Sequence, residues 1–132
     1  MAVISALTVL VVDDDPNAVE LIAVRLMGVA TNVPRTHGGR EAIETARRQL
    51  PDLIGLDLMM PEFSGFDVVN ALPARPDTAC IPILVITARQ ITEEDRRTLN
   101  GFVATIMEKA EFDGDRFTAE VRRPMSGRPQ AA

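Results

Sequence analysis

The segment Pro51-Asp52-Leu53-Ile54-Gly55-Leu56-Asp57-Leu58-Met59-Met60-Pro61 decides the fold. It is an apolar run that is bounded by two prolines and carries Asp57 near its far end. A short apolar run between turn residues is typical of a strand buried on both faces, and helical patterns on either side favour a parallel sheet. Asp57 is therefore expected at the carboxyl end of a central strand, where open α/β sheets bind their ligands.

Composition limits the function classes. The chain has 132 residues, of which 46% are hydrophobic, and a formal net charge of -5. This size fits one domain, and the hydrophobic content argues against a chain that is disordered as a whole. The negative charge argues against binding of nucleic acid or of an anionic membrane by the domain. The single cysteine, Cys80, cannot form an intrachain disulfide, so a reducing compartment is expected.

The flanks of the N-terminal apolar run argue against export, and the lengths of all apolar segments argue against membrane insertion. No Lys or Arg precedes the apolar run at the N-terminus, which leads into Asp13 instead of a cleavage site. No apolar segment reaches the ~20 residues that span a bilayer. The expected location is cytoplasmic, with no membrane partner.

The remaining pattern alternates strands with helices. Besides the opening segment, strands are predicted at residues 7–12, 29–33, 81–87 and 102–107, and helices at 16–28, 39–50, 66–72, 93–99 and 113–123. Leu50 is expected to face inward, and the strand before Pro34 is expected at the sheet edge. The alternation predicts a doubly wound α/β fold with a five-stranded parallel sheet of flavodoxin-like order 2-1-3-4-5, although periodicity alone does not fix that order.

Polar side chains follow four of these strands. Asp13 and Asp14 follow the first strand, Asp57 ends the third, Thr87 ends the fourth and Lys109 lies just beyond the fifth. In a 2-1-3-4-5 sheet these four strands are consecutive neighbours, so their carboxyl ends line one crevice. We expect all five side chains to converge there.

Three carboxylates in one crevice repel each other. At ~4 Å and an effective dielectric constant of ~20, each pair costs on the order of 4 kcal/mol. Lys109 offsets part of this cost, and a divalent cation offsets it more completely. Oxygen ligands without His or Cys suit Mg²⁺, with Mn²⁺ as an alternative, and such a site usually awaits a phosphate.

The other groups fit a phosphate ligand. Lys109 supplies a positive charge, Thr87 a hydroxyl donor, and the Ala88 amide a backbone donor. A carboxylate that faces Mg²⁺, Lys and Thr is a plausible nucleophile toward phosphorus. Catalysis would then consist of positioning and charge neutralisation.

Three motifs together carry a family resemblance. Val9-Leu10-Val11-Val12-Asp13-Asp14-Asp15-Pro16, Asp52-Leu53-Ile54-Gly55-Leu56-Asp57-Leu58-Met59-Met60-Pro61 and Ile83-Leu84-Val85-Ile86-Thr87-Ala88 resemble the CheY-like receiver domain of bacterial response regulators. The resemblance covers about residues 7–123, which places a receiver domain at residues 1–124 and a flexible tail at 125–132.

The resemblance implies a role for each residue. Asp57 would take a phosphoryl group from a histidine kinase or a histidine phosphotransfer protein, and the domain would then switch contacts with a downstream protein. Asp14, Asp57 and the Met59 carbonyl would hold Mg²⁺ directly, with Asp13 acting through water. Thr87 and Lys109 would bind the phosphoryl oxygens.

The chain departs from the family pattern around its fifth strand. Ala110 follows Lys109 where the family usually has proline, and Ile106 occupies the position of an aromatic switch residue. These changes concern output more than phosphoryl chemistry. The short, late fourth helix resembles receivers of hybrid histidine kinases, and a stand-alone regulator is the alternative. No effector domain is expected after Arg123. A homodimer is a possible assembly that the sequence leaves undecided.

Other function classes were weighed against a phosphorylatable receiver. A phosphatase that forms an aspartyl-phosphate normally needs an acid two residues after the nucleophile, where this chain has Met59. A flavin binder would place its phosphate against Asp13-Asp14-Asp15, which would repel it. A pseudo-receiver that only binds partners does not need Asp14, Asp57, Thr87 and Lys109. We therefore expect that the chain catalyses only its own phosphorylation and dephosphorylation. The lone His37, in a loop, is expected to be solvated.

Overall fold

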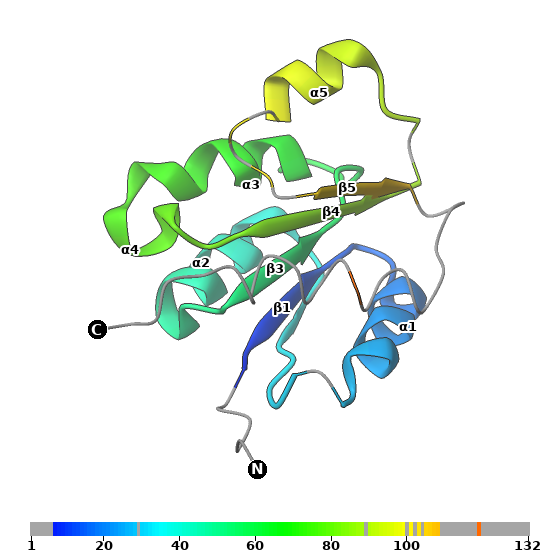
Figure 1. Ribbon diagram of the computed structural model, residues 1–132, viewed down its shortest axis with the longest axis vertical. Helices are drawn as coiled ribbons and strands as arrows, with labels where there is room; N and C mark the ends of the chain where they lie inside the picture. The colour runs from blue at the N-terminus through cyan, green and yellow to red at the C-terminus, as the bar shows by residue number, and fades with distance from the viewer. Residues whose placement is uncertain are drawn as a thin grey trace.

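Five parallel strands form the centre of the molecule. The computed structural model describes residues 7–28, 30–88, 90–99, 101, 103, 105–108 and 119. Within them the strands are β1 (Val9–Val12), β2 (Arg35–Thr36), β3 (Leu53–Leu56), β4 (Ile83–Thr87) and β5 (Thr105–Glu108). Their order is β2-β1-β3-β4-β5, and every pairing is parallel (Figure 1). The predicted doubly wound sheet and its order are confirmed.

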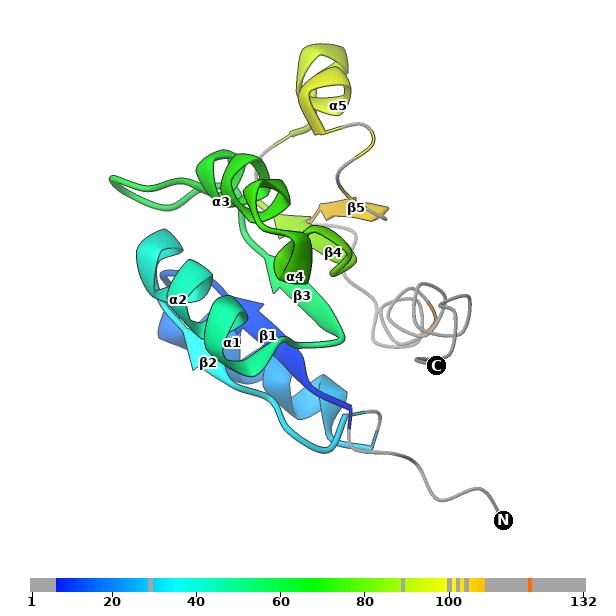
Figure 2. The same ribbon diagram turned by 90° about the vertical axis from the view of Figure 1, so that its left-hand side faces the viewer.

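Helices cover both faces of this sheet. They are α1 (Pro16–Leu26), α2 (Gly39–Gln49), α3 (Gly65–Ala71), α4 (Pro76–Ala79) and α5 (Glu93–Leu99), with a 3₁₀ turn, η1 (Leu72–Ala74), after α3. Figures 1 and 2 show α2 and α3 on one side of the sheet and α1 on the other. None of the helices described here has the length and apolar character needed to cross a bilayer.

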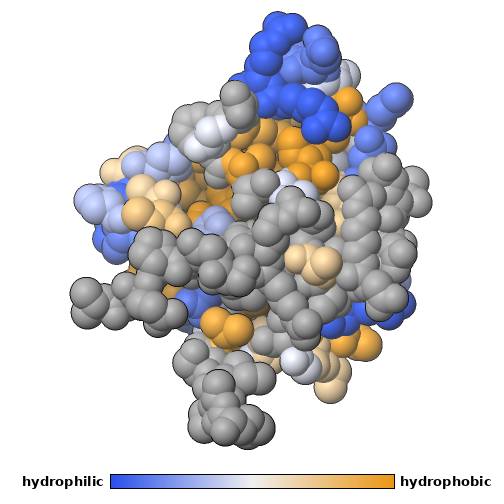
Figure 3. All heavy atoms as spheres, viewed as in Figure 1, coloured by the Kyte–Doolittle hydropathy of each residue, from blue (hydrophilic) through white to orange (hydrophobic). Residues whose placement is uncertain are grey.

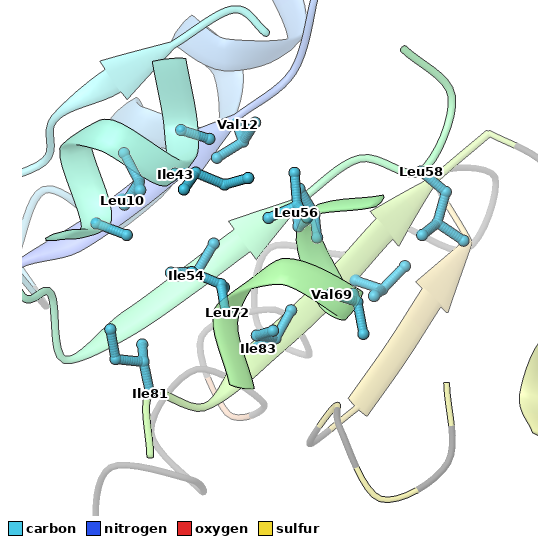
Figure 4. Packing of buried hydrophobic residues seen from close by; sticks show 14 of the residues in the cluster. Leu10, Val12, Ile43, Ile54, Leu56, Leu58, Val69, Leu72, Ile81 and Ile83 are labelled. Carbon is cyan, nitrogen blue, oxygen red and sulfur yellow. The ribbon is translucent and has the colours of Figure 1, made fainter. Parts of the chain in front are cut away.

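Two hydrophobic clusters, one on each face, hold the layers together. Along β1, Leu10 and Val12 point into the cluster beneath α2 and α3, while Val9 and Val11 point into the cluster beneath α1. Figure 4 shows the first cluster, in which Ile54, Leu56 and Ile83 of the sheet meet Ile43 and Val69 of the helices. Because alternate side chains are buried on opposite faces, the central strands are apolar throughout, as the sequence predicts.

The second strand differs from its prediction. It lies at Arg35–Thr36, beyond Pro34, and among residues 30–33, the described part of the expected strand, the one pairing is an isolated bridge between Asn32 and Thr8. Pro34 accepts a hydrogen bond from the Val11 amide at 3.0 Å through its carbonyl. A proline at a sheet edge lacks only the donor, so pairing continues past it. The expected edge position itself is confirmed.

Smaller differences have local causes. Leu50 does not face inward: it ends α2 in the left-handed conformation, with φ of 47°, and is 49% exposed. The described part of the fifth strand covers Thr105–Glu108, and Val103, within the expected residues 102–107, is not part of it. Helix α4 was not expected, and the Thr78 hydroxyl secures it by donating to the Leu72 carbonyl at 2.7 Å. Of the helix predicted at 113–123 only Ala119 is among the described residues, and it is helical, while the tail at 125–132 lies outside them.

Candidate functional site

Asp13 and Asp57 are neighbours because they follow two residues that are paired across the sheet. Val12 of β1 pairs with Leu56 of β3, so the next residue on each strand is an aspartate. The Asp57 amide donates to the Val12 carbonyl at 2.9 Å, which extends the ladder by one step. Adjacent strands lie about 4.8 Å apart, which places the two carboxylates side by side. Asp13 is 1% exposed and Asp57 4%.

Asp14 completes a cluster of three carboxylates. One oxygen from each of Asp13, Asp14 and Asp57 lies within 4.8 Å of the others. Two of these residues are buried, and Asp14 is exposed. At a spacing of 4.8 Å and an effective dielectric constant of ~20, one pair of charges repels by about 3.5 kcal/mol. The donor set is all oxygen, carries three negative charges and opens to solvent at Asp14, so it fits Mg²⁺ or Mn²⁺.

The third aspartate of the run has a structural role. Asp15 caps α1, because its carboxylate accepts a hydrogen bond from the Asn17 amide at 3.0 Å. The Asp15 amide in turn donates to Oδ1 of Asp13 at 2.9 Å. Pro16 occupies the first turn of the helix, where a missing amide hydrogen costs nothing. The residue that caps α1 therefore also holds the Asp13 carboxylate in place through its amide.

The loop after β3 is held against the start of α3. Oδ1 of Asp57 accepts a hydrogen bond from the Met59 amide at 3.2 Å, and the Gly65 amide donates to the Leu58 carbonyl at 3.2 Å. Gly65 has no room for a side chain, since a Cβ there would overlap the carbonyl oxygen of Asp57 and the Cα of Leu58. Helix α3 therefore packs directly against the backbone that carries Asp57.

Met59 and its neighbours form an open groove along the loop between β3 and α3. The groove has a volume of about 490 Å³ and is lined by Leu58, Met59, Met60, Pro61, Ser64 and Phe66. The Met59 side chain is 52% exposed. The structure thus places Met59 next to Asp57 in the same loop, while the predicted ligand role of its carbonyl stays a prediction.

Thr87 and Ala88 occupy the end of the adjacent strand. Val85 of β4 pairs with Leu56, so Thr87 lies one position further along β4 than Asp57 does along β3. Thr87 is fully buried, and Ala88 is exposed. Across the sheet Thr87 pairs with Glu108, the last residue of β5. Lys109 is the next residue in the sequence and lies outside the described residues, so its role stays a prediction.

One contact at the site was not expected from sequence. His37 is exposed but not merely solvated, because its ring nitrogen Nδ1 lies 3.3 Å from the carbonyl oxygen of Asp13. A lone histidine in a loop carries no spacing pattern that could indicate this contact. It depends on where β2 lies relative to β1, and the sequence pattern placed that strand at 29–33 instead of at Arg35–Thr36.

Comparison with known proteins gives one family. A family model described as the response regulator receiver domain matches residues 9–122. The probable transcriptional regulatory protein TcrX of Mycobacterium tuberculosis is 40% identical over 87 residues, which cover 66% of this chain and 36% of TcrX. An uncharacterised 14.6 kDa protein of Leptolyngbya boryana is 32% identical over 97 residues, which cover 74% of this chain and 73% of that protein.

Solved structures agree at the level of the whole fold. The signal receiver domain of a histidine kinase from Syntrophus aciditrophicus aligns with a TM-score of 0.84 at 26% identity, covering 96% of both chains. The chemotaxis protein CheY4 of Vibrio cholerae has a TM-score of 0.82 at 24% identity, covering 90% of this chain and 98% of CheY4, and supports the fold alone. The chain spans 36% of the length of TcrX and of the response regulator MtrA of Mycolicibacterium smegmatis.

Proposed function

The chain belongs to the response regulator receiver domain family, and from that premise we propose that it accepts a phosphoryl group on Asp57 in two-component signalling. One observation carries the proposal: Asp57 is buried at the carboxyl end of the central strand, in a cluster with Asp13 and Asp14. A buried carboxylate among like charges is an unfavourable arrangement unless a cation or a positive side chain balances it. A phosphorylation site that operates with a divalent cation accounts for this arrangement.

Asp57 is the nucleophile in the proposed reaction. One of its carboxylate oxygens forms a bond to phosphorus while the bond from phosphorus to the donor nitrogen breaks, and that nitrogen keeps the electron pair. The Met59 amide, which donates to Oδ1 of Asp57, fixes the orientation of the carboxylate before the reaction. The close packing of Gly65 on the Asp57 backbone holds the same geometry from the other side.

Asp13, Asp14 and Asp57 are the residues that would hold Mg²⁺, together with the Met59 carbonyl. The cation would neutralise negative charge on the carboxylates and on the phosphoryl oxygens. Asp14 is exposed and so lies where incoming phosphate and metal have access. Asp13 is buried and tied to the Asp15 amide, which suits a ligand that acts through water.

Thr87, Ala88 and Lys109 are proposed to bind the phosphoryl oxygens. Thr87 lies at the end of the strand next to Asp57, and the exposed Ala88 follows it. In the sequence Lys109 follows Glu108, the partner of Thr87 in the sheet, and we propose that it acts at the same edge. In this arrangement the hydroxyl, the Ala88 amide and the ammonium group balance charge that moves onto the phosphoryl group.

The proposed donor is a histidine kinase or a histidine phosphotransfer protein. Helix α1 begins two residues after Asp14 and runs away from the site, and it exposes Leu21 and Val24 along its length, which gives a protein donor an apolar surface on the helix that starts at the site. The phosphorylated domain then changes its contacts with a downstream protein. Relatives such as MtrA are named as DNA-binding regulators. We propose that the domain described here does not itself contact DNA, consistent with its net charge of -5.

The chain is proposed to act only on its own phosphoryl group. Met59 occupies the position where an aspartyl-phosphate phosphatase would need a second acid, and its side chain is apolar and half exposed. Attack on the phosphoryl group by water then depends on the residues that already surround Asp57. External phosphate esters are not substrates in this account.

Intact-protein mass spectrometry tests the proposal. With acetyl phosphate and Mg²⁺ the protein should gain one phosphoryl group, and chelation of the metal should prevent the gain. Asp57→Asn should not be labelled, whereas Asp77→Asn should be labelled normally, because Asp77 is exposed and paired with Arg75 on α4. Labelling of the Asp57→Asn variant at the rate of the unaltered protein would refute Asp57 as the acceptor.

A further inference from the structure

The imidazole of His37 connects the corner between β2 and α2 to the loop after β1. Its Nδ1 lies 3.3 Å from the carbonyl oxygen of Asp13. A carbonyl oxygen only accepts, so Nδ1 must carry the hydrogen in this contact. We propose that His37 is a positioning residue that orients the Asp13–Asp14 peptide and thereby keeps the Asp14 carboxylate beside Asp13 and Asp57; this inference rests on the metal site of the proposed function.

Asp14 depends on its backbone for its position. Asp13 is fixed at its amide, which donates to the Thr36 carbonyl at 3.2 Å, and at its carboxylate, which accepts from the Asp15 amide. Asp14 is exposed, and its carboxylate makes no hydrogen bond to another residue in the part of the chain that the structure describes. The peptide between Asp13 and Asp14 therefore determines where that carboxylate points, and His37 binds this peptide at its carbonyl.

The corner that carries His37 is itself well anchored. The His37 amide donates to Oε1 of Glu41 in the first turn of α2 at 2.9 Å. Gly39 packs against Phe63 of the loop after β3 so closely that a Cβ would lie 2.5 Å from the Phe63 carbonyl oxygen. The Arg40 guanidinium also lies over the Phe63 ring, 5.0 Å from its centre. The corner thus links the loop that carries Asp14 to the loop that follows Asp57.

Metal affinity separates positioning from a merely structural role. Binding of Mn²⁺ can be followed by the loss of the electron paramagnetic resonance signal of the free ion. We expect His37→Ala to weaken Mn²⁺ binding by ~3–10-fold, the effect of one ordinary hydrogen bond on an equilibrium constant. His37→Asn, whose amide nitrogen lies nearest the place of Nδ1, should restore most of the affinity, and His37→Gln should not. Equal affinities for all three folded variants and the unaltered protein would overturn the inference.

The tautomer of the ring gives an independent readout. His37 is the only histidine in the sequence, so a long-range ¹H–¹⁵N correlation spectrum contains a single imidazole. The neutral ring should carry its hydrogen on Nδ1, as the contact with Asp13 requires. A neutral ring with its hydrogen on Nε2 would show that the contact is not a hydrogen bond, and the positioning role would fall with it.

The same titrations distinguish this inference from the function on which it rests. If the unaltered protein binds no Mn²⁺, or if Asp14→Ala binds it equally well, the metal site is wrong and the inference falls with it. If Asp14→Ala loses binding while His37→Ala keeps it in full, the metal site stands and only the role of His37 is refuted.

Discussion

Asp14 and Asp15 are identical residues one position apart, and their surroundings give them different roles. Asp15 is not part of the carboxylate cluster and caps α1, whereas Asp14 belongs to the cluster and does not cap the helix. Removing Asp14 relieves repulsion, so Asp14→Ala should leave the free energy of unfolding without metal level or higher. The rise is small because Asp14 is exposed and solvent screens it. Thermal unfolding without Mg²⁺ measures the difference in stability between Asp14→Ala and the unaltered protein.

Asp15→Ala is the matched comparison. Loss of an N-cap carboxylate costs about 0.5–2 kcal/mol, so this variant should be less stable than the unaltered protein. Mg²⁺ should still stabilise the Asp15 variant and should no longer stabilise the Asp14 variant. A clear loss of metal-free stability in Asp14→Ala would show that Asp14 is a structural residue and that the charge argument is wrong.

Gly65 shows how a residue without a side chain controls the site. An added methyl group would overlap the Asp57–Leu58 backbone, which cannot move aside as a flexible side chain would. We expect Gly65→Ala to lower the free energy of unfolding by about 1–3 kcal/mol and to slow phosphorylation by acetyl phosphate. Gly55→Ala is the control, since its methyl group would meet Cδ1 of Ile86 at 3.8 Å, an ordinary contact. Normal phosphorylation and stability in Gly65→Ala would contradict the proposed packing.

At the scale of elements, prediction from sequence succeeded where a cap or an apolar stripe defines the segment. The sequence Thr92-Glu93-Glu94-Asp95 predicts a capping box at the start of the helix at 93–99, and Thr92 and Asp95 do exchange hydrogen bonds of 3.0 Å there. Prediction failed for β2, which has two residues and no apolar run of its own. Its position depends on pairing with β1, a long-range interaction that no local pattern contains. Leu50 was misplaced for a similar reason, since the left-handed turn after α2 decides its exposure.

Helix α5 is the element that we expect to report phosphorylation. It has seven residues, and Leu99 is its one large apolar side chain in the core, with Asp95 buried in the capping box. Its remaining surface is hydrophilic, and it stands at the β5 end of the molecule (Figures 2 and 3). So small an anchor makes local opening easy. Ile106, by contrast, has no ring to move when Thr87 shifts toward a phosphoryl group.

Hydrogen exchange with and without beryllofluoride tests this expectation. Amide protection should change at Ala88 and at residues 90–99, and should change little at Ile106. Changes confined to β5 would show that the signal takes another route. Because Ala110 and not proline follows Lys109, a cis bond there would cost ~2.5–4 kcal/mol and we expect this peptide bond to be trans. Both residues lie outside the described ones, so this stays a prediction.

At the scale of the whole molecule, the alternation of strands and helices was sufficient to predict a doubly wound sheet. It was also sufficient to bring Asp13, Asp14 and Asp57 to one edge, because carboxyl ends of parallel strands meet there. The bond from His37 to Asp13 could not be predicted, since it joins residues 24 positions apart through two loops. The ends of the apolar central strands are thus predictable from sequence, whereas contacts between loops require the structure.

The central claim is that phosphoryl transfer ends on the side chain of Asp57. Borohydride reduces an aspartyl phosphate to homoserine, so reduction after treatment with acetyl phosphate and Mg²⁺, followed by tandem mass spectrometry of peptides, locates the acceptor. The account predicts homoserine at position 57, dependent on Mg²⁺, and unmodified aspartate at positions 13 and 14. Homoserine at position 13 or 14, or none at position 57 in a protein that has gained a phosphoryl group, would contradict it.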